Sequence, residues 1–545
     1  MMVDVVAPRA RLAIALVATM AVVGCHTATE LELRVSAPSV SLLNPLSLAV
    51  SDLVLKNESD AILAAVSVGA NRDAAGRLPF GVLDPMLAGD LRLDVMSGSQ
   101  LVGLAAIENT AIVPGERVTL EADIRKPLVF IGADDAPEGA GPRAAVQLLD
   151  PTTSTDLAAR GITVPASQAA AFTIDGKRLL LAADDGLRAF DTGTGTTAGP
   201  KALPFVAGLI AVSPKNGGVA LIERGAVNAR VLLYESVVGL LTTPETSAPV
   251  SVTITAGRPR AAHFSIDGQT LYVLVEPATA EPCTGPTPPA NQIIPITRSG
   301  TMSGAIKMPS YVADFAVDRT GRFILSEAGA NRISVMGQGG MTTKLYDATC
   351  PTALRLVGDQ LFAVTNDTSQ AVPDAFTLMR GRVDGSPVTM LPIARPSYTT
   401  QLNDSSTRDD LTRLNLQFVS IAVAGQEIAI SPDGNRAFIS TRSRYLEDGK
   451  QSFMFASFTC FATIDIVEYG VHSIDLVSGT SSYASRSQTV VIPKQVLPPL
   501  RPDPCVQGTA SLGGFPPINL VLELDCPAAL GDRASGLAAA FSEQP

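Results

Sequence analysis

The sequence has no tryptophan and only 3 histidines, and charged residues make up 17% of its 545 residues. The lack of Trp counts against binding sites that stack on sugars or bases, although 8 Tyr and 18 Phe remain. The chain has 41 Lys and Arg against 52 Asp and Glu, a net charge of −11, so it lacks the basic surface that phosphate contacts require. We therefore expect no nucleic-acid partner, and a carbohydrate partner is disfavoured.

Several catalytic and cofactor-binding motifs are missing as well. The sequence contains no G-x-S-x-G, H-E-x-x-H or G-x-x-x-x-G-K-[ST] motif, and no C-x-x-C-H for covalent haem. Its histidines, His26, His263 and His472, are far apart, and His263 and His472 are more typical of packed or surface side chains than of a catalytic base. We expect no cofactor beyond the calcium ion considered below.

The first residues have the pattern of an export signal. Arg9 and Arg11 precede an almost wholly apolar stretch, 12–23, which is too short for a transmembrane span. The stretch ends in Val-Val-Gly-Cys at 22–25, which resembles the bacterial lipobox. The resemblance implies that residues 1–24 are a cleaved signal peptide and that Cys25 carries a lipid that anchors the chain to a membrane. An ordinary signal peptide that contains a cysteine is the alternative.

The resemblance to lipoproteins also carries an expectation of location. His26 stands where some lipoproteins carry an aspartate that retains them in the inner membrane, which favours the outer membrane.

In an oxidising compartment the remaining five cysteines are expected to form disulfides, with at least one left over. Cys505 and Cys526 bracket one Pro-rich segment and are the preferred pair, and no close C-x-x-C spacing indicates a metal site.

Residues 30–126, after a tether at 25–29, alternate between apolar and polar side chains. Strands with one apolar and one polar side are half-buried, and about 95 residues suit one Ig-like, antiparallel β-sandwich. The segment contains no catalytic constellation, so a spacer or partner-binding role is expected. The alternation is found at 31–35, 91–95 and 118–124.

A different unit repeats from about residue 169 onward. Each copy has an apolar strand, a polar turn that contains glycine, and a second apolar strand. Repeats of about 40–50 residues with several strands per unit are typical of β-propellers. Asp191 and Asp475 begin similar turns later in two of the units. The turn glycines are Gly176, Gly218, Gly268, Gly321, Gly358 and Gly434.

The repeats resemble the YVTN and lactonase-like propeller families. Ser-Pro-Asp-Gly at 431–434 matches the family turn, as Ser-Ile-Asp-Gly at 265–268 does ahead of Leu-Tyr-Val at 271–273, and Ala-Val-Thr-Asn at 363–366 is similar to the name motif. The likeness covers residues 165–485 and concerns the fold, because such repeats specify blades and not reactions. The order of signal, sandwich and propeller also resembles large lipoproteins of myxobacterial-type organisms.

The sequence therefore predicts an all-β chain, in which an N-terminal antiparallel β-sandwich is followed by a six- or seven-bladed β-propeller. The propeller is expected at 127–497 and a Pro-rich segment and tail at 498–545. A seventh blade would be closed by 127–133 and 145–149 together with C-terminal strands. Insertions between second and third strands are expected at 281–291 and 442–470, and a short helix at 405–415.

The ends of the second blade strands are the candidate ligand positions, because a propeller's loops between second and third strands form its usual ligand face. Oxygen ligands that converge from several blades are what Ca²⁺ requires. In the lactonase-like families a central metal of this kind polarises an ester carbonyl. The alternative is that the strand-end residues are ordinary solvated side chains. Arg442, the one arginine among them, favours a bound anion or a salt bridge. The candidates are Asp184, Glu223, Glu276, Glu327, Asn366 and Arg442.

The first hypothesis for function is a non-enzymatic, lipid-anchored envelope protein that binds or scaffolds protein partners. Rigid propeller loops offer a broad recognition surface without a catalytic set. The second hypothesis is a calcium-dependent, lactonase-like hydrolase that uses the strand-end carboxylates. A redox accessory role resembling quinoprotein propellers is a third, which no residue supports directly.

Overall fold

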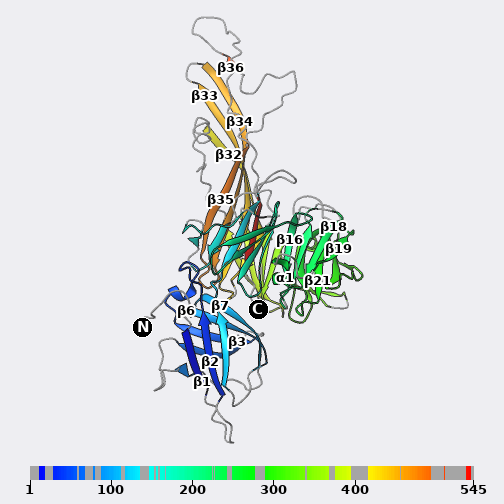
Figure 1. The fold of residues 1–545 in the computed structure, drawn as a ribbon. Helices are drawn as coiled ribbons and strands as arrows, with labels where there is room; N and C mark the ends of the chain where they lie inside the picture. Colours follow the sequence, from blue (N-terminus) through cyan, green and yellow to red (C-terminus); the bar gives the residue numbers. More distant parts are fainter. Residues whose placement is uncertain are drawn as a thin grey trace.

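The computed structural model describes residues 12–18, 29–57, 61–67, 78–79, 88–111, 117–134, 147–394, 415–453, 456–491, 508–509 and 536–541, except 153–154, 158–159, 166, 168, 216, 224, 226, 242–247, 277–288, 338–339, 367–374 and 432. This part of the chain is almost entirely β (Figure 1). Its helical segments are short: η1 (Pro45–Ser47), α1 (Val237–Leu241) and η3 (Ala328–Ala330). No helix in this part has the length and apolarity needed to cross a bilayer.

The N-terminal unit consists of two four-stranded sheets. One has the order β4-β3-β6-β7 and is antiparallel throughout, as the sequence predicted. The other has the order β5-β1-β2-β8, and in it β2 pairs with β8, and β1 with β5, in parallel. The strands are β1 (Leu12–Ala18), β2 (Thr29–Ser36), β3 (Asp52–Asn57), β4 (Ile62–Ser67), β5 (Leu78–Pro79), β6 (Ala88–Ser97), β7 (Gln100–Ala111) and β8 (Arg117–Asp123).

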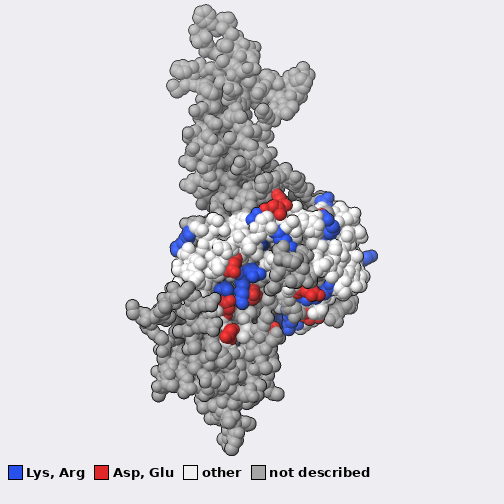
Figure 2. Space-filling view, viewed as in Figure 1, with Lys and Arg blue, Asp and Glu red and all other residues white. Residues whose placement is uncertain are grey.

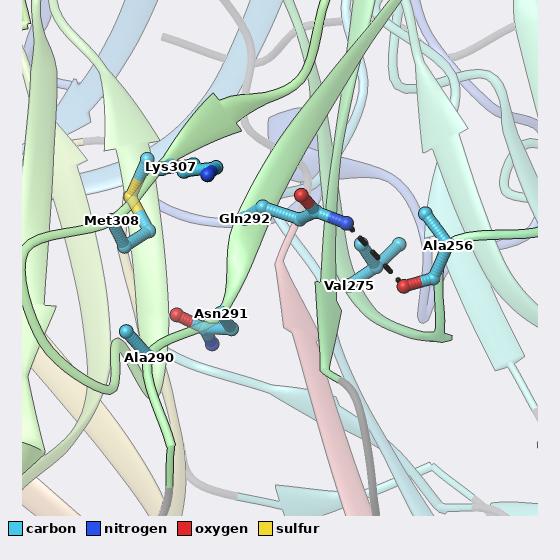
Figure 3. A pocket seen from close by; sticks show the side chains of 7 residues that line it. All are labelled: Ala256, Val275, Ala290, Asn291, Gln292, Lys307 and Met308. Atoms are coloured by element: carbon cyan, nitrogen blue, oxygen red, sulfur yellow. Dashed lines mark hydrogen bonds between the residues drawn. The ribbon is translucent and has the colours of Figure 1, made fainter.

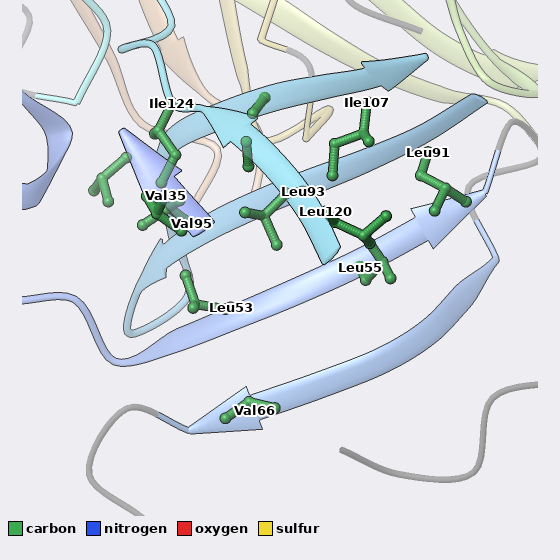
Figure 4. Close-up of a cluster of buried hydrophobic side chains, with 13 residues drawn as sticks. Val35, Leu53, Leu55, Val66, Leu91, Leu93, Val95, Ile107, Leu120 and Ile124 are labelled. Carbon is green, nitrogen blue, oxygen red and sulfur yellow. The ribbon is translucent and has the colours of Figure 1, made fainter. Parts of the chain in front are cut away.

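The core of this unit follows the period-two pattern (Figure 4). Leu91, Leu93 and Val95 on β6 are buried, and the alternation explains why they share one side of the sheet. The residues between them differ from the expected wet face, because Arg92 and Asp94 are also buried. They form an ion pair in which Arg92 Nε lies 2.7 Å from Asp94 Oδ1, so the charge of each is compensated.

The repeats form six sheets, each built from four successive strands in antiparallel order. The regular pairing arises because each unit supplies an apolar strand on either side of a tight turn. The strands of the first three sheets are β12–β15 (Ala169–Phe172, Arg178–Ala183, Gly186–Asp191, Thr197–Lys201), β16–β19 (Ala207–Val212, Val219–Glu223, Ala229–Tyr234, Val250–Ile254) and β20–β23 (Arg258–Phe264, Thr270–Glu276, Gln292–Thr297, Ile306–Lys307). Those of the next three are β24–β27 (Asp314–Val317, Phe323–Glu327, Arg332–Met336, Thr342–Asp347), β28–β31 (Pro351–Val357, Gln360–Asn366, Ala375–Arg382, Thr389–Ala394) and β32–β35 (Asn415–Ile430, Arg436–Phe453, Ala456–Asp475, Ser481–Val491).

One further sheet joins the two ends of the propeller sequence. β9 (Val129–Asp134) pairs with β10 (Gln147–Asp150) on one side and with the C-terminal strand β37 (Gly536–Phe541) on the other. β11 (Thr155–Asp156) completes it. This is the closing arrangement that the sequence predicted, and the number of blades, six or seven, stays a prediction.

Three of the turns between first and second strands share one hydrogen-bonding pattern. The hydroxyl of Ser265 donates to Asp267 Oδ1 at 2.5 Å, and Gly268 donates its backbone N–H to the Ser265 carbonyl at 2.8 Å. Gly268 has φ +68°, a conformation that favours glycine. The hydrogen bond from Ser265 holds the pKa of Asp267 below its usual value. Equivalent hydroxyl-to-aspartate bonds close the turns at 173–176 and 431–434.

The sheet β32–β35 is much longer than the other five. The sequence predicted an insertion at 442–470, whereas β33 and β34 run straight through this range as one extended hairpin. Asn415, the last residue of the expected helix, begins β32, and the rest of that helix lies outside the described residues. Figure 1 shows the sheet projecting from the propeller, and we call its projecting part the arm.

The sandwich unit and the propeller are packed together. Leu43, which precedes η1, is fully buried in a cluster with Leu128 and Phe130 of the propeller sequence. Beside it, Lys126 Nζ lies 2.5 Å from Asp150 Oδ2, and both side chains are buried. The buried leucine and the buried ion pair together hold the sandwich unit and the propeller in a fixed relative position.

Candidate functional site

Five of the six candidate positions lie where the sequence placed them, at the ends of second strands. Because the strands of successive blades run in the same direction, these ends share one face of the propeller. We call this face the mouth. Glu223, Glu276, Glu327 and Asn366 are the last residues of β17, β21, β25 and β29, and Asp184 follows β13.

Arg442 was wrongly placed by the sequence. It lies within β33, opposite Ala424 and Tyr469, and the strand continues to Phe453. The count from the turn glycine assumed a second strand of ordinary length, and the arm extends this one. The side chain of Arg442 lies outside what the structure describes.

Glu223 is held by one arginine of its own blade. Arg230 donates from Nε to Glu223 Oε2 at 3.0 Å and from Nη2 to Oε1 at 2.9 Å, and its backbone N–H also donates to Oε2. These bonds lower the pKa of Glu223. The two-point geometry fixes the carboxylate on the strand pair β17–β18.

Glu276 is buried and bound by one side chain of its own blade and one from the connection to the next blade. The Tyr311 hydroxyl donates to Glu276 Oε2 at 2.9 Å, and Arg260 Nη1 lies 3.5 Å from the same oxygen. Burial, more than the neighbouring charges, raises the pKa of Tyr311. Neither partner could be found from the sequence, because Tyr311 stands 35 residues from Glu276 in a segment without a motif.

Glu327 is fully buried and has the most contacts of the mouth carboxylates described. Arg332 donates to both of its oxygens at 3.0 Å, and Ser310 donates to Oε2 at 2.7 Å. Ser334 also hydrogen-bonds to it. A carboxylate with this many donors is satisfied within the fold and acts there as a structural acceptor.

Of the two remaining mouth positions, one has an exposed side chain and the other has an amide in place of a carboxylate. Asp184 is exposed, and its neighbour Asp185 pairs with Arg188. Asn366 is buried and donates from Nδ2 to Thr352 Oγ1 at 3.1 Å. Across the part of the chain that the structure describes, no three His, Cys, Asp or Glu side chains group closely enough to hold a metal ion. The calcium site stays a prediction.

A small pocket lies beside Val275 near the end of β21 (Figure 3). It has a volume of about 240 Å³, and its amide groups are engaged: Asn291 donates to the Val312 carbonyl at 2.7 Å, and Gln292 to the Ala256 carbonyl at 3.4 Å. Lys307 is the one charged side chain among its seven lining residues, and none of these seven is a nucleophile or acid. The pocket offers room for a small polar group and no catalytic pair.

The two propeller histidines are packed side chains, as the sequence predicted. His472 is buried between Phe376 and Tyr483, with ring centroids at 5.2 and 4.7 Å, and His263 meets Phe315 edge-on. Burial lowers the pKa of each histidine to about 4. The two histidines are protonated at a higher pH in the unfolded chain than in the folded one. The free energy of unfolding therefore decreases as the pH falls from 6.5 toward 4.

The cysteines are described in part. Cys350, which lies between β27 and β28, is disulfide-bonded and buried. Cys25, Cys505 and Cys526 lie outside the described residues, so the lipid site and the pair Cys505–Cys526 stay predictions.

Among known proteins, the chain is similar to solved structures but matches no family model and no curated sequence. The chain is similar to a putative 6-phosphogluconolactonase from Bacteroides uniformis (10% identity, 67% of this chain and 99% of that chain, TM-score 0.39). It is also similar to virginiamycin B lyase from Staphylococcus aureus (10%, 58% and 84%, TM-score 0.35) and to TolB from Acinetobacter baumannii (14%, 60% and 85%, TM-score 0.32). All three are β-propeller-like, and at these TM-scores the likenesses carry no argument about function.

Proposed function

We propose that this protein is a lipid-anchored component of the cell envelope that binds protein partners through the mouth of its propeller. The observation that carries this proposal is the variety of the connections between second and third strands, which lie at the mouth. They range from the two residues 184–185 to the stretch 277–291, whereas the turns between first and second strands are all short. Variable connections on a rigid scaffold are where propellers and other folds place recognition.

The mouth carboxylates support a recognition surface over a reactive one. Glu223, Glu276 and Glu327 each accept hydrogen bonds or lie beside an arginine, so their oxygens hold neighbouring strands in place. On the side of the molecule seen in Figure 2, acidic and basic side chains lie next to one another. The hydrolase that the sequence also suggested would need these oxygens to be released for a metal.

The anchor is proposed from the sequence, and one structural feature supports the compartment that it implies. The disulfide at Cys350 supports an oxidising compartment such as the periplasm or the cell surface. In the full chain, β1 pairs with β2, and cleavage in front of Cys25 would remove β1 and leave β8 as the described neighbour of β2. The lipid would then be attached at the start of the sandwich unit, and His26 favours the outer membrane.

The anchor is tested by labelling growing cells with palmitate. The wild-type chain is expected to carry the label and to fractionate with the outer membrane, because the lipid is its attachment. A Cys25→Ser variant is expected to lose both properties, while Cys505→Ser, the matched control, keeps them. Label that persists in Cys25→Ser would overturn the proposed lipid site, and fractionation with the inner membrane would overturn the proposed location.

A further inference from the structure

The arm is the feature of the molecule that the proposed function does not use. Its strands β33 and β34 are 18 and 20 residues long, whereas the corresponding strands β21 and β22 of another blade have 7 and 6. Figure 1 shows the arm and the sandwich unit at opposite ends of the molecule. Such an extension adds nothing to blade packing, because it leaves the propeller.

The sequence at the far end of the arm is rich in phenylalanine. Residues 451–464 also contain no Asp, Glu, Lys, Arg or His. Four of the chain's 18 phenylalanines lie in this stretch, at 453, 455, 458 and 461. Lys450 on β33 and Asp465 on β34 flank the uncharged stretch. We call residues 451–453 and 456–464 the arm end.

The strand register places apolar positions of the arm end on both faces of the hairpin. Cys460 is opposite Gln451, and Phe461 is opposite Lys450, as expected for regular antiparallel strands. Because successive positions alternate between faces, Phe458 and Phe461, three residues apart, belong to opposite faces. A flat protein surface covers one face of a hairpin, whereas a lipid layer surrounds both.

The pairing of the backbone limits how deeply such an element enters a membrane. Within the described residues, the pairing of β32 reaches Lys450 and that of β35 reaches Asp465, so neither strand flanks the arm end there. β36 (Gly508–Thr509) pairs with β34 at 457–458. Backbone groups without partners are costly in the hydrocarbon core and are solvated in the interfacial layer.

We propose that the arm end docks in the interfacial layer of a lipid bilayer. Its phenylalanines enter the boundary between headgroups and acyl chains, and Lys450 and Asp465 stay at the level of the headgroups. The contact is reversible and separate from the lipid on Cys25, because the arm and the sandwich unit lie at opposite ends of the molecule. The inference therefore holds or fails independently of the proposed anchor.

The lack of tryptophan in the chain allows a clean test. Full-length protein carrying Phe458→Trp is mixed with phosphatidylcholine vesicles whose acyl chains are brominated. The expected result is a blue shift and loss of most of the fluorescence, because bromine quenches tryptophan near the acyl boundary. A reporter placed nearer the propeller, Tyr445→Trp, is expected to keep its emission, and adding Phe461→Asp to Phe458→Trp is expected to restore it.

Three outcomes would overturn the inference. One is sedimentation with the vesicles without quenching of the Phe458→Trp reporter, which would show attachment through the Cys25 lipid alone. A second is equal quenching of the Tyr445→Trp reporter. The third is quenching that persists with Phe461→Asp while the thermal melting of the propeller is unchanged.

Discussion

Replacing Glu327 by alanine is expected to lower the free energy of unfolding of the propeller by about 3 kcal/mol, the lower end of the range for breaking a buried ion pair. Glu327 is 0% exposed, whereas the side chain of Arg332 keeps 31% exposure, so the arginine that is left behind is partly solvated. The hydroxyls of Ser310 and Ser334 lose their acceptor at the same time. Chemical denaturation of the purified protein measures the loss.

The matched control is Asp347→Ala, a carboxylate on the outer strand β27 of the same sheet. Its side chain is 85% exposed and pairs with Lys344 at 3.0 Å, so we expect a change within about 0.5 kcal/mol. Equal losses in the two variants would contradict the structural role of Glu327.

Thermal melts recorded with and without CaCl₂ test the calcium hypothesis. Stabilisation by calcium that disappears in the double variant Glu276→Gln with Glu327→Gln would favour a metal site.

The second large effect is expected at the junction between the sandwich unit and the propeller. Leu43→Ala should cost about 3 kcal/mol, because it opens a cavity in a cluster that includes Leu128 and Phe130. The two units should also separate more readily, which limited proteolysis measures as faster release of a propeller-sized fragment. Leu46→Ala makes the same change at a leucine that is 39% exposed and should alter neither quantity appreciably. If Leu43→Ala is cleaved at the wild-type rate, the junction is not fixed by Leu43.

The sequence predicted the parts of this fold that depend on local pattern. A hydroxyl, an aspartate and a glycine within four residues are enough to close the turn at 265–268, so the repeats were readable without any partner. The same holds for Asp191 and Asp475, whose carboxylates both accept backbone N–H groups two and three residues on. Local rules of this kind need no knowledge of the tertiary structure.

The sequence could not predict what depends on distant contacts. Five of the strand-end positions, among them Glu276 and Glu327, were placed correctly as strand ends, but Glu276 was read as open to solvent or a ligand, and Tyr311 binds it from the connection that precedes the next blade. Arg442 was misplaced because strand length is set by pairing with β32 and β34, which the turn motif does not encode. Likewise, the alternation in β6 predicted an exposed Asp94, which is buried against Arg92.

The central claim, recognition of a protein partner at the mouth, is tested most directly by photo-crosslinking in living cells. A photoreactive phenylalanine analogue is placed at Asp184 and Val227, both exposed between second and third strands, and at Met302 and Val477, both exposed between third and fourth strands on the opposite face. The account predicts one and the same crosslinked protein from both mouth positions and none from the opposite face. No adduct from the mouth positions, or equal adducts from both faces, would contradict it.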